Sequence, residues 1–556
     1  MTSEPELTDL WWKNAVVYCL DVETFADTDG DGHGDLTGLI DRLGYLVDLG
    51  VTCLWLMPFH PSPHLDDGYD VTDHYGVDPR FGSLGDFAVL VRVAKACGLR
   101  VIIDLVVNHT STQHPWFRAA RRSRTSRFRD YYVWSDRKRA PKQPTVFPGE
   151  EDDVWTWDEQ AGQYYLHHFY SHQPEVNLAN RAVVEEIAKI MGFWLQLGVD
   201  GFRVDAVPFL IEPDSMPPEL ASDPHRLLRD LRRFLSRRRG DAVLLGEVNL
   251  PPKAAVEYFG REGDEMQLLL NFPVMQATYL SLARGRAGPL ATALRRQPRP
   301  PDDSQWANFL RSHDEVTLDQ LSDREREDVF AAFGPDEQMR IYGRGLRRRL
   351  PPMLGGDPRR IRMAYSLLLT MPGVPVLFYG EEIGMGENLE VPGRLSVRTP
   401  MQWSDDRNAG FSTAAPSRLT RPVVVGPFGP LAVNVADQQG DDDSMLSWMS
   451  KAIRLRRALP ELGWGEPEVL RTDHPGILAH LCRWHDHATL AVHNFCQEAF
   501  SVRIARGQCR WEESIRDVFG SGSDEIRRVG DDLELTVGAY GYRWLRLGES
   551  AGDTAP

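Results

Sequence analysis

The sequence predicts an α/β protein built on a closed (β/α)8 (TIM) barrel, because eight short apolar segments alternate with stretches of helical length. Strand–helix alternation predicts parallel pairing, and eight such units predict closure. The connecting stretches LTGLIDRLGYLVDLG and LGDFAVLVRVAKACG end at Gly, as helices often do. The strand segments are AVVYCLDV (15–22), CLWLMP (53–58), RVIIDLVV (100–107), GFRVDAV (201–207), VLLGEV (243–248), LLLNFP (268–273), NFLRSHD (308–314) and VPVLFYG (374–380).

Two regions depart from this alternation. About 90 residues separate the third and fourth strand segments, which is too long for a loop and predicts a small inserted domain. After about residue 458, short alternating segments such as TLAVHNF and DLELTVG predict a C-terminal antiparallel β-sandwich. We therefore expect a barrel of residues 1–107 and 173–457, an insert of 108–172, a sandwich of 458–548 and a disordered tail of 549–556.

Charge, the N-terminal sequence and the cysteine content restrict which partners and which compartment the protein is expected to have. The formal net charge of −17 argues against nucleic acid, so the basic runs RRSRTSRFRD and RGLRRRL are interpreted as solvated or ion-paired faces. The acidic N-terminus MTSEPELTDLWW does not resemble a signal peptide, and no apolar run predicts a membrane span. The six cysteines form no disulfide framework, which favours a reduced cytoplasmic setting. A homo-oligomer is left open.

Ionisable side chains follow several predicted strands at their carboxyl ends, where barrels of this kind place their active sites. Arg203 and Asp205 are two residues apart, so they point to the same face of their strand. One such residue alone is more often a helix cap or a buried ion pair. A whole rim of carboxylates shifts the pKa values of its members, and active sites are where such shifts concentrate. The candidates on this rim are Asp66, Asp67, Tyr69, His109, Arg203, Asp205, Glu247, His313 and Asp314.

Paired carboxylates without metal-ligand spacing suggest glycosyl chemistry, in which one carboxylate attacks the sugar carbon and a protonated one serves the leaving oxygen. DLVVNH (104–109), GFRVDAV (201–207), GEV (246–248) and SHDE (312–315) resemble, in order and spacing, four motifs of the α-amylase family of glycoside hydrolases and transglycosidases. The resemblance implies that Asp205 is the nucleophile, Glu247 the general acid/base and Asp314 a residue that holds sugar hydroxyls. Tyr69, His109, Arg203 and His313 would surround the first sugar.

Longer stretches, among them PFHPSPHLDDGYDVTD and VRTPMQWSDDRNAGF, resemble trehalose synthases, which interconvert maltose and trehalose. HQPEVN is similar to the oligo-1,6-glucosidase branch, in which an Asp before GYD pairs with an Arg and closes the pocket. That pair would be Asp66 and Arg394, with Arg398 as the alternative partner. The implied substrates are small α-glucosides such as maltose or trehalose. CLDVETF (19–25) departs from the more usual Val-x-x-Arg-x-Phe pattern.

Two alternatives to trehalose synthesis stay open at this point. One is an α-glucosidase-type hydrolase, and the other is a non-catalytic sugar-binding or subunit module. The balance between isomerisation and hydrolysis depends on how tightly the freed sugar is held. Aromatic residues of the insert, Trp155, Trp157, Tyr164 and Tyr165, are candidates for a roof over that sugar.

The segment DTDGDGHGD (27–35) has the rhythm of oxygen ligands in a calcium loop, with glycines that allow the tight turn. It predicts Ca²⁺, or Mg²⁺ in its place, and no organic cofactor is indicated. The expected ligands are Asp27, Asp29, Asp31 and Asp35, to which the family resemblance adds the His33 carbonyl. The resemblance also implies a second ion between barrel and insert, held by Asn108, Glu175, Glu212 and the carbonyls of Phe209 and Leu210.

Overall fold

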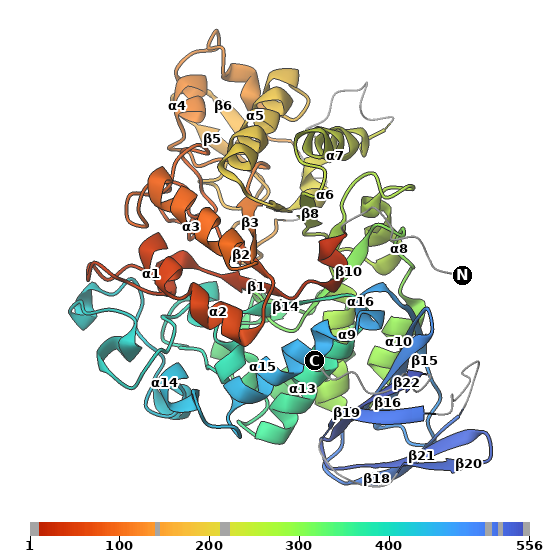
Figure 1. The fold of residues 1–556 in the computed structure, drawn as a ribbon. Coiled ribbons are helices and arrows are strands. Elements are labelled where there is room, and N and C mark those ends of the chain that lie inside the picture. Colours follow the sequence, from red (N-terminus) through yellow and green to blue (C-terminus); the bar gives the residue numbers. More distant parts are fainter. Residues whose placement is uncertain (1–9, 140–144, 212–222, 506–513, 521–525, 549–556) are drawn as a thin grey trace.

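The computed structural model describes residues 10–139, 145–211, 223–505, 514–520 and 526–548 (Figure 1). Its centre is a closed barrel in which eight parallel strands follow the order β1-β14-β10-β9-β8-β7-β3-β2, and this confirms the predicted fold class. The barrel strands are β1 (Val17–Leu20), β2 (Cys53–Leu56), β3 (Arg100–Leu105), β7 (Gly201–Val204), β8 (Val243–Gly246), β9 (Leu268–Leu270), β10 (Gln305–Phe309) and β14 (Val374–Phe378).

Each predicted strand segment contains one barrel strand, but the seventh is displaced. The strand covers Gln305–Phe309, whereas the sequence pattern places it at 308–314. Gln305 can lie in the buried strand because its side-chain amide donates to the carbonyl of Gly463 at 2.8 Å. His313 and Asp314 consequently stand on the loop beyond the strand, at the barrel's carboxyl end.

Helices surround the barrel (Figure 1). The predicted helix after β1 is broken at Arg42 into α1 and α2, and α3 begins with a capping box between Ser83 and Asp86. The helices are α1 (Leu36–Asp41), α2 (Leu43–Leu49), α3 (Leu84–Ala96), α4 (Pro115–Arg122), α5 (Arg181–Leu197), α6 (Val207–Leu210), α7 (Arg226–Arg238), α8 (Pro252–Ala255), α9 (Phe272–Arg284), α10 (Gly288–Arg296), α11 (Asp323–Phe333), α12 (Leu350–Met353), α13 (Pro358–Thr370), α14 (Val435–Gln438), α15 (Met445–Arg457) and α16 (Glu461–Trp464).

Between β3 and α5 the chain leaves the barrel and forms α4 and a small antiparallel sheet of order β4-β6-β5 (Figure 1, top). Its strands are β4 (Trp134–Ser135), β5 (Trp155–Asp158) and β6 (Gln163–Leu166). A second small sheet follows β10 and joins β11 (Val316–Thr317), β13 (Gly345–Leu346) and β12 (Arg340–Ile341).

The C-terminal region forms two antiparallel sheets that share one apolar core (Figure 1, blue). It is anchored on α13, since His480 and His493 contact Thr370 and Ser366 at 2.9 and 3.0 Å. The sheets have the orders β15-β16-β17-β22-β19 and β18-β21-β20, with strands β15 (Glu466–Val469), β16 (Ile477–Trp484), β17 (His487–Asn494), β18 (Phe500–Ile504), β19 (Ser514–Gly520), β20 (Arg527–Val529), β21 (Asp532–Val537) and β22 (Tyr542–Gly548). The predicted tail, 549–556, lies outside the described residues.

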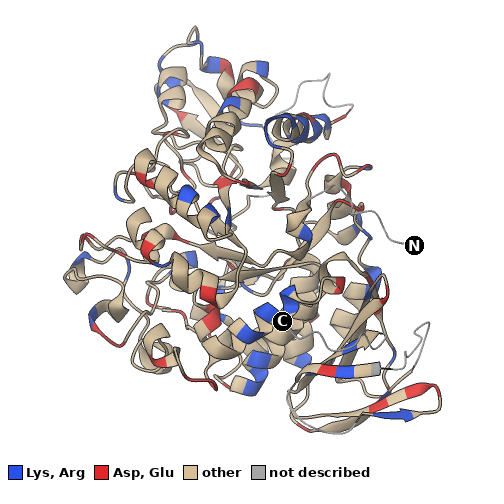
Figure 2. Ribbon diagram, in the orientation of Figure 1, with Lys and Arg blue, Asp and Glu red and all other residues tan. Residues whose placement is uncertain are grey.

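Positive and negative side chains are interspersed over most of the ribbon, with a concentration of arginines on α7 (Figure 2). The basic run 344–350 is engaged within the protein: Arg348 pairs with Glu387 at 2.8 Å and Arg349 donates to the Tyr379 carbonyl at 2.7 Å. In the run 121–130, Arg121 pairs with Asp158. Nowhere in the described part of the chain is a helix both long and apolar enough to cross a membrane.

Candidate active site

A pocket of about 310 Å³ opens where the barrel strands end. Barrel strands, the insert and the loops after β10 and β14 all contribute to it. Seven of the residues predicted for the site line it, namely Asp66, Tyr69, His109, Asp205, Glu247, Asp314 and Arg394. The other three, Arg203, His313 and Arg398, are each 1% exposed and lie behind the wall, where they contact the lining residues.

Arg203 on β7 is the charge centre of the pocket floor. Its Nη1 donates to Asp205 Oδ1 at 2.6 Å and to Asp104 Oδ1 at 2.5 Å, and its Nη2 donates to Glu247 Oε2 at 2.6 Å. The register of the parallel strands brings these groups together, since Asp104 on β3 pairs with Arg203. Glu247 stands just beyond β8, the other neighbour of β7. One guanidinium therefore serves three carboxyl groups.

The two candidate catalytic groups that share Arg203, namely Asp205 and Glu247, have different pKa values. Burial raises the pKa of Asp205 to about 6, although Arg203 opposes the shift. Burial also raises the pKa of Glu247 to about 7, and the nearby Asp205 and Asp314 add to the effect. The backbone N–H of Ala206, a residue in the left-handed region at φ 49°, donates to Glu247 at 3.1 Å. These pKa values place the loss of the Asp205 proton at a lower pH than the loss of the Glu247 proton.

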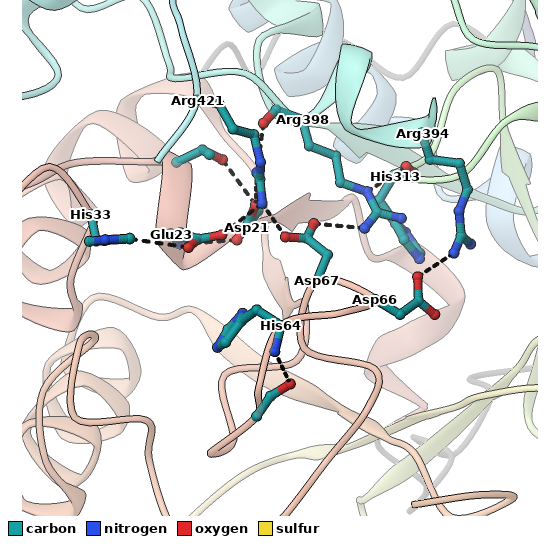
Figure 3. A network of polar contacts seen from close by, with 12 residues as sticks. Asp21, Glu23, His33, His64, Asp66, Asp67, His313, Arg394, Arg398 and Arg421 are labelled. Atoms are coloured by element: carbon teal, nitrogen blue, oxygen red, sulfur yellow. Dashed lines mark hydrogen bonds and ion pairs between the residues drawn. The ribbon is translucent and has the colours of Figure 1, made fainter. Parts of the chain in front are cut away.

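A second set of ion pairs joins residues of the pocket lining, among them Asp66 and Arg394 (Figure 3). Arg394 donates from Nη1 to Asp314 and from Nη2 to Asp66, both at 2.6 Å. Gln173 adds a hydrogen bond to the other oxygen of Asp66 at 2.9 Å. Burial alone would raise the pKa of Asp314, but His313, Arg394 and Arg398 together hold it well below its usual range. Asp314 thus stays ionised and presents acceptor oxygens to the pocket.

Aromatic and imidazole side chains complete the wall. Tyr69 stacks on His313 with ring planes 8° apart, and its hydroxyl lies 2.6 Å from His313 Nε2. Burial lowers the pKa of His313 to about 4 and that of His109 to about 3, so both imidazoles are neutral at pH 7. Neutral imidazoles suit hydrogen bonding to sugar hydroxyls better than binding of anions.

The roof of the pocket differs from the prediction. Trp155, Trp157, Tyr164 and Tyr165 do not line it: Trp155 packs in the core of the insert, and Trp157 is 44% exposed. They belong to the small sheet, in which β5 pairs with β6, and Tyr165 packs in the main core cluster rather than in the pocket lining. The insert instead contributes Phe147 and Phe169 to the lining.

The hairpin β12–β13 holds the Phe147 segment in place. Arg344 donates to the carbonyl of Val146 at 2.6 Å, and the ring of Tyr342 lies 5.1 Å from that of Phe147. The guanidinium of Arg394 also lies over the Phe147 ring, 4.8 Å from its centroid. Two segments far apart in sequence therefore meet above the pocket.

Sequence reasoning missed several residues of the site. Asn249 lines the pocket two residues after Glu247 and is fixed by Asp319 and Gln320, each at 2.8 Å. Its place directly after the GEV motif was the available signal. Phe147 lies in an irregular segment without periodicity, and no local pattern marks it. Asp104 was visible as a charge within an apolar strand segment.

The aspartate-rich loop brings three of its predicted ligands together. Carboxylate oxygens of Asp27, Asp29 and Asp35 lie within 4.8 Å of one another. Asp31 is not in this group, and its carboxylate accepts the N–H of His33 at 2.8 Å. The three carboxylates form the hard oxygen set that calcium prefers.

At the predicted second ion site, Asn108 and Glu175 are both 1% exposed and lie on adjacent segments. Within the described residues, the side-chain oxygen and nitrogen of Asn108 have no hydrogen-bond partner. Phe209 and Leu210 lie on α6, where the Phe209 ring packs against that of His168. The expected ligand Glu212 lies outside the described residues.

Comparisons with known proteins agree with this geometry. The family model "Alpha amylase, catalytic domain" matches residues 21–330 and 347–465, and "Sucrose hydrolase-like, C-terminal domain" matches 487–546. "Trehalose synthase/amylase TreS" of Mycobacterium tuberculosis is 40% identical over 97% of this chain and 90% of that protein. The "Trehalose synthase" of Pimelobacter sp. is 39% identical over 98% and 96%. That of Thermus thermophilus is 43% identical over 97% of this chain and 56% of its own length.

Solved structures agree as well. The α-amylase from H. orenii superposes with a TM-score of 0.78 at 27% identity, covering 96% of this chain and 99% of that one. A mutant of the trehalulose synthase MUTB superposes at 0.76 and 26% identity, covering 97% and 100%. With the barrel, the carboxylate cluster and these relatives in agreement, the chain belongs to the α-amylase family and is a glucosyl-transferring or hydrolysing enzyme of that family.

Proposed function

We propose that this enzyme interconverts maltose and trehalose by moving a glucosyl group through a covalent intermediate on Asp205. The observation that carries the proposal is the bridge that Arg394 makes between Asp66 and Asp314 in the pocket lining, which we infer closes one end of the pocket. A barrier there leaves room for one terminal glucose and excludes the interior of a long chain. Relatives named trehalose synthases, at about 40% identity over the full chain, support the same substrate class.

In the proposed reaction, the ionised carboxylate of Asp205 attacks the anomeric carbon of the terminal glucose. Glu247 gives its proton to the departing 4-oxygen, so the glycosidic bond breaks and a glucosyl ester forms on Asp205. Glu247, now ionised, removes the proton from the anomeric hydroxyl of the freed glucose, whose oxygen displaces Asp205. The product is trehalose, and both catalytic groups return to their starting states.

Isomerisation rather than hydrolysis requires that the freed glucose stays in the pocket while it turns. Phe147 and Phe169 support this, because they line the pocket beside Arg394, and the β12–β13 hairpin holds the segment that carries Phe147. A trapped partner has a high effective concentration, and water exclusion slows the competing attack. An α-glucosidase-type hydrolase is the second candidate, and it would follow if this part of the lining opened during turnover.

We also propose that the loop of residues 27–35 holds Ca²⁺ through Asp27, Asp29 and Asp35. Asp27 already accepts the N–H groups of Gly30 and Gly32 at 2.7 and 2.9 Å, which preorganises the loop. The loop is separate in sequence from the catalytic carboxylates, so its ion would act on stability. The unpartnered side chain of Asn108 fits a second ion between barrel and insert.

Replacing either catalytic carboxyl should abolish maltose turnover, but for different reasons. Asp205→Asn removes the nucleophile and should lower kcat by about 10³-fold or more. Glu247→Gln removes the acid and should cost about 10²- to 10⁴-fold. A substrate such as α-glucosyl fluoride, whose leaving group needs no proton, should restore ester formation in Glu247→Gln and not in Asp205→Asn. Equal rescue of both variants would contradict the assigned roles.

The pH dependence of kcat/KM should be bell-shaped. Activity should fall below about pH 6, where Asp205 becomes protonated, and above about pH 7, where Glu247 loses its proton. The two groups interact, so the measured values belong to the pair. Initial rates on maltose, measured in buffers of constant ionic strength, test this. A flat profile across both values would show that one of these groups is not required.

Incubation with maltose should yield trehalose as the main product, with little incorporation of added labelled glucose. Phe147→Ala should raise the share of free glucose severalfold, because it opens the roof to water. Trp157→Ala is the matched control, since this exposed ring does not line the pocket. Glucose as the sole product of the unaltered enzyme would establish the α-glucosidase instead.

Removal of divalent cations should lower the melting temperature by several degrees, because an ion bound only to the folded state stabilises it. Asp29→Asn should abolish the response to chelator, whereas Asp31→Asn should keep it, because Asp31 stands outside the ligand group. Thermal unfolding with and without chelator and added Ca²⁺ measures the shift. An unchanged melting temperature in the unaltered protein would rule out the site.

A further inference from the structure

Behind the closed end of the pocket lies a second, buried layer of charge, which we call the rear network: Asp21, Glu23, Asp67, Arg398 and Arg421 (Figure 3). None of its side chains is more than 9% exposed. Two of its carboxylates come from the segment CLDVETF, whose acidic residues the catalytic scheme does not use. Buried charges are costly unless each has a partner, so the arrangement requires an explanation.

Asp67 bridges the two arginines of the rear network. Its Oδ2 accepts from Arg398 Nη1 at 2.7 Å, and its Oδ1 accepts from Arg421 Nη2. Arg421 is itself fixed by Asp21 at 3.0 Å, by Glu23 at 2.7 Å and by the carbonyl of Arg398 at 2.7 Å. Asp67 is therefore held by a cation that cannot move without breaking several other bonds.

Arg398 carries this rigidity to the pocket. Its Nη2 donates to Asp314 Oδ1 at 3.1 Å, and its Nε donates to the carbonyl of His313 at 2.8 Å. One edge of the guanidinium thus faces Asp67 and the other faces the wall of the site. Without Asp67, the only remaining carboxylate beside Arg398 in the ion pairs of the described residues would be Asp314.

The backbone at Asp67 points to a role for its carboxylate. Asp67 has φ 51°, in the left-handed region that costs a residue other than glycine about 1 kcal/mol or more. Glycine would relieve this strain, so the conformation itself does not call for aspartate. Strained residues that persist cluster at functional sites, where their side chains are needed.

We propose that Asp67 and Arg421 are positioning residues that hold Arg398 in place, and so fix Asp314 where it binds sugar hydroxyls in the transition state. The inference rests on the role proposed above for Asp314. It adds that the orientation of Asp314 is set from outside the pocket by two residues that do not contact the substrate. Arg394 restrains Asp314 from the pocket side, and Arg398 restrains it from behind.

The variant Asp67→Gly separates this role from a structural one. It removes the bridging carboxylate but relieves the backbone, which offsets part of the cost of the unpaired arginines, so kcat and KM are compared well below the melting temperature of the variant. The value of kcat should nevertheless fall about 10- to 100-fold, because small displacements of a positioning group have effects of this size. KM should change by less than about threefold, since the lost contacts matter most in the transition state.

Asp67→Asn is the conservative variant. Asparagine tolerates the left-handed region and retains one oxygen that can accept from an arginine, so it should recover part of the lost kcat. His485→Gly is the matched control, because His485 also has φ 51° but lies on an exposed turn between β16 and β17. This control should match the unaltered enzyme in kcat and KM.

Arg421→Leu tests whether Arg421 acts through Asp67. In a double-mutant cycle, the variant with both Asp67→Gly and Arg421→Leu should lose no more kcat than Asp67→Gly alone. If Arg421→Leu does not fold, because Asp21 and Glu23 lose their shared cation, the Asp67 variants still decide the question. A wild-type kcat in Asp67→Gly would overturn the proposal, as would a loss confined to KM.

The measurements are ordered so that the proposed function and the positioning role of Asp67 and Arg421 are tested separately. Turnover of maltose by the unaltered enzyme is measured first and tests the proposed function by itself. If neither trehalose nor glucose forms, the same ratios of kcat are measured on p-nitrophenyl α-glucoside. If Asp67→Gly and the unaltered enzyme turn over the chosen substrate at equal rates, the positioning role is contradicted. That result leaves the proposed function untouched.

Discussion

The ion pairs of Arg203 are the interaction on which the active site depends. Three carboxyl groups, from Asp104, Asp205 and Glu247, share this one buried cation. A single positive charge cannot balance three negative ones in a medium of low dielectric constant, so the site favours retention of a proton. Burial raises the pKa of all three groups, and it raises that of Glu247 the furthest, to about 7. In the proposed mechanism, this order of pKa values separates the acid, Glu247, from the nucleophile, Asp205.

Arginines organise the pocket at successive depths. Arg203 pairs with carboxyl groups on the floor, Arg394 bridges Asp66 and Asp314, and Arg398 lies behind Asp314. Guanidinium groups suit these positions because their rigid fork can serve two or three carboxylates at once. The pocket lining, in contrast, includes aromatic rings, the neutral imidazole of His109 and carboxylate oxygens. Ion pairs therefore hold the site together, and under the proposed function hydrogen bonds and apolar surface recognise the sugar.

Much of this could be predicted from sequence, because strand order and strand ends carry strong local signals. GFRVDAV and GEV placed Arg203, Asp205 and Glu247 on neighbouring strands, and the structure brings them to one pocket. The displaced seventh strand shows the limit of apolar patterning, since a buried Gln305 has a distant partner that the local sequence does not reveal. Phe147 and Arg421 were missed for the same reason: their placement depends on contacts with Tyr342 and Asp21, which are distant in sequence.

The rear network has a consequence for how this enzyme can change over evolution. Its members come from separate stretches of the chain, around residues 21–23, 67, 398 and 421, yet each neutralises another in a buried setting. Loss of any single member exposes the others to an unpaired charge, so the cost of each substitution depends on which residues already occupy the remaining positions. A substitution at one of these positions therefore has to be accompanied by compatible changes at the others. A chimera that exchanges one of these stretches with a relative should therefore need compensating changes at the others.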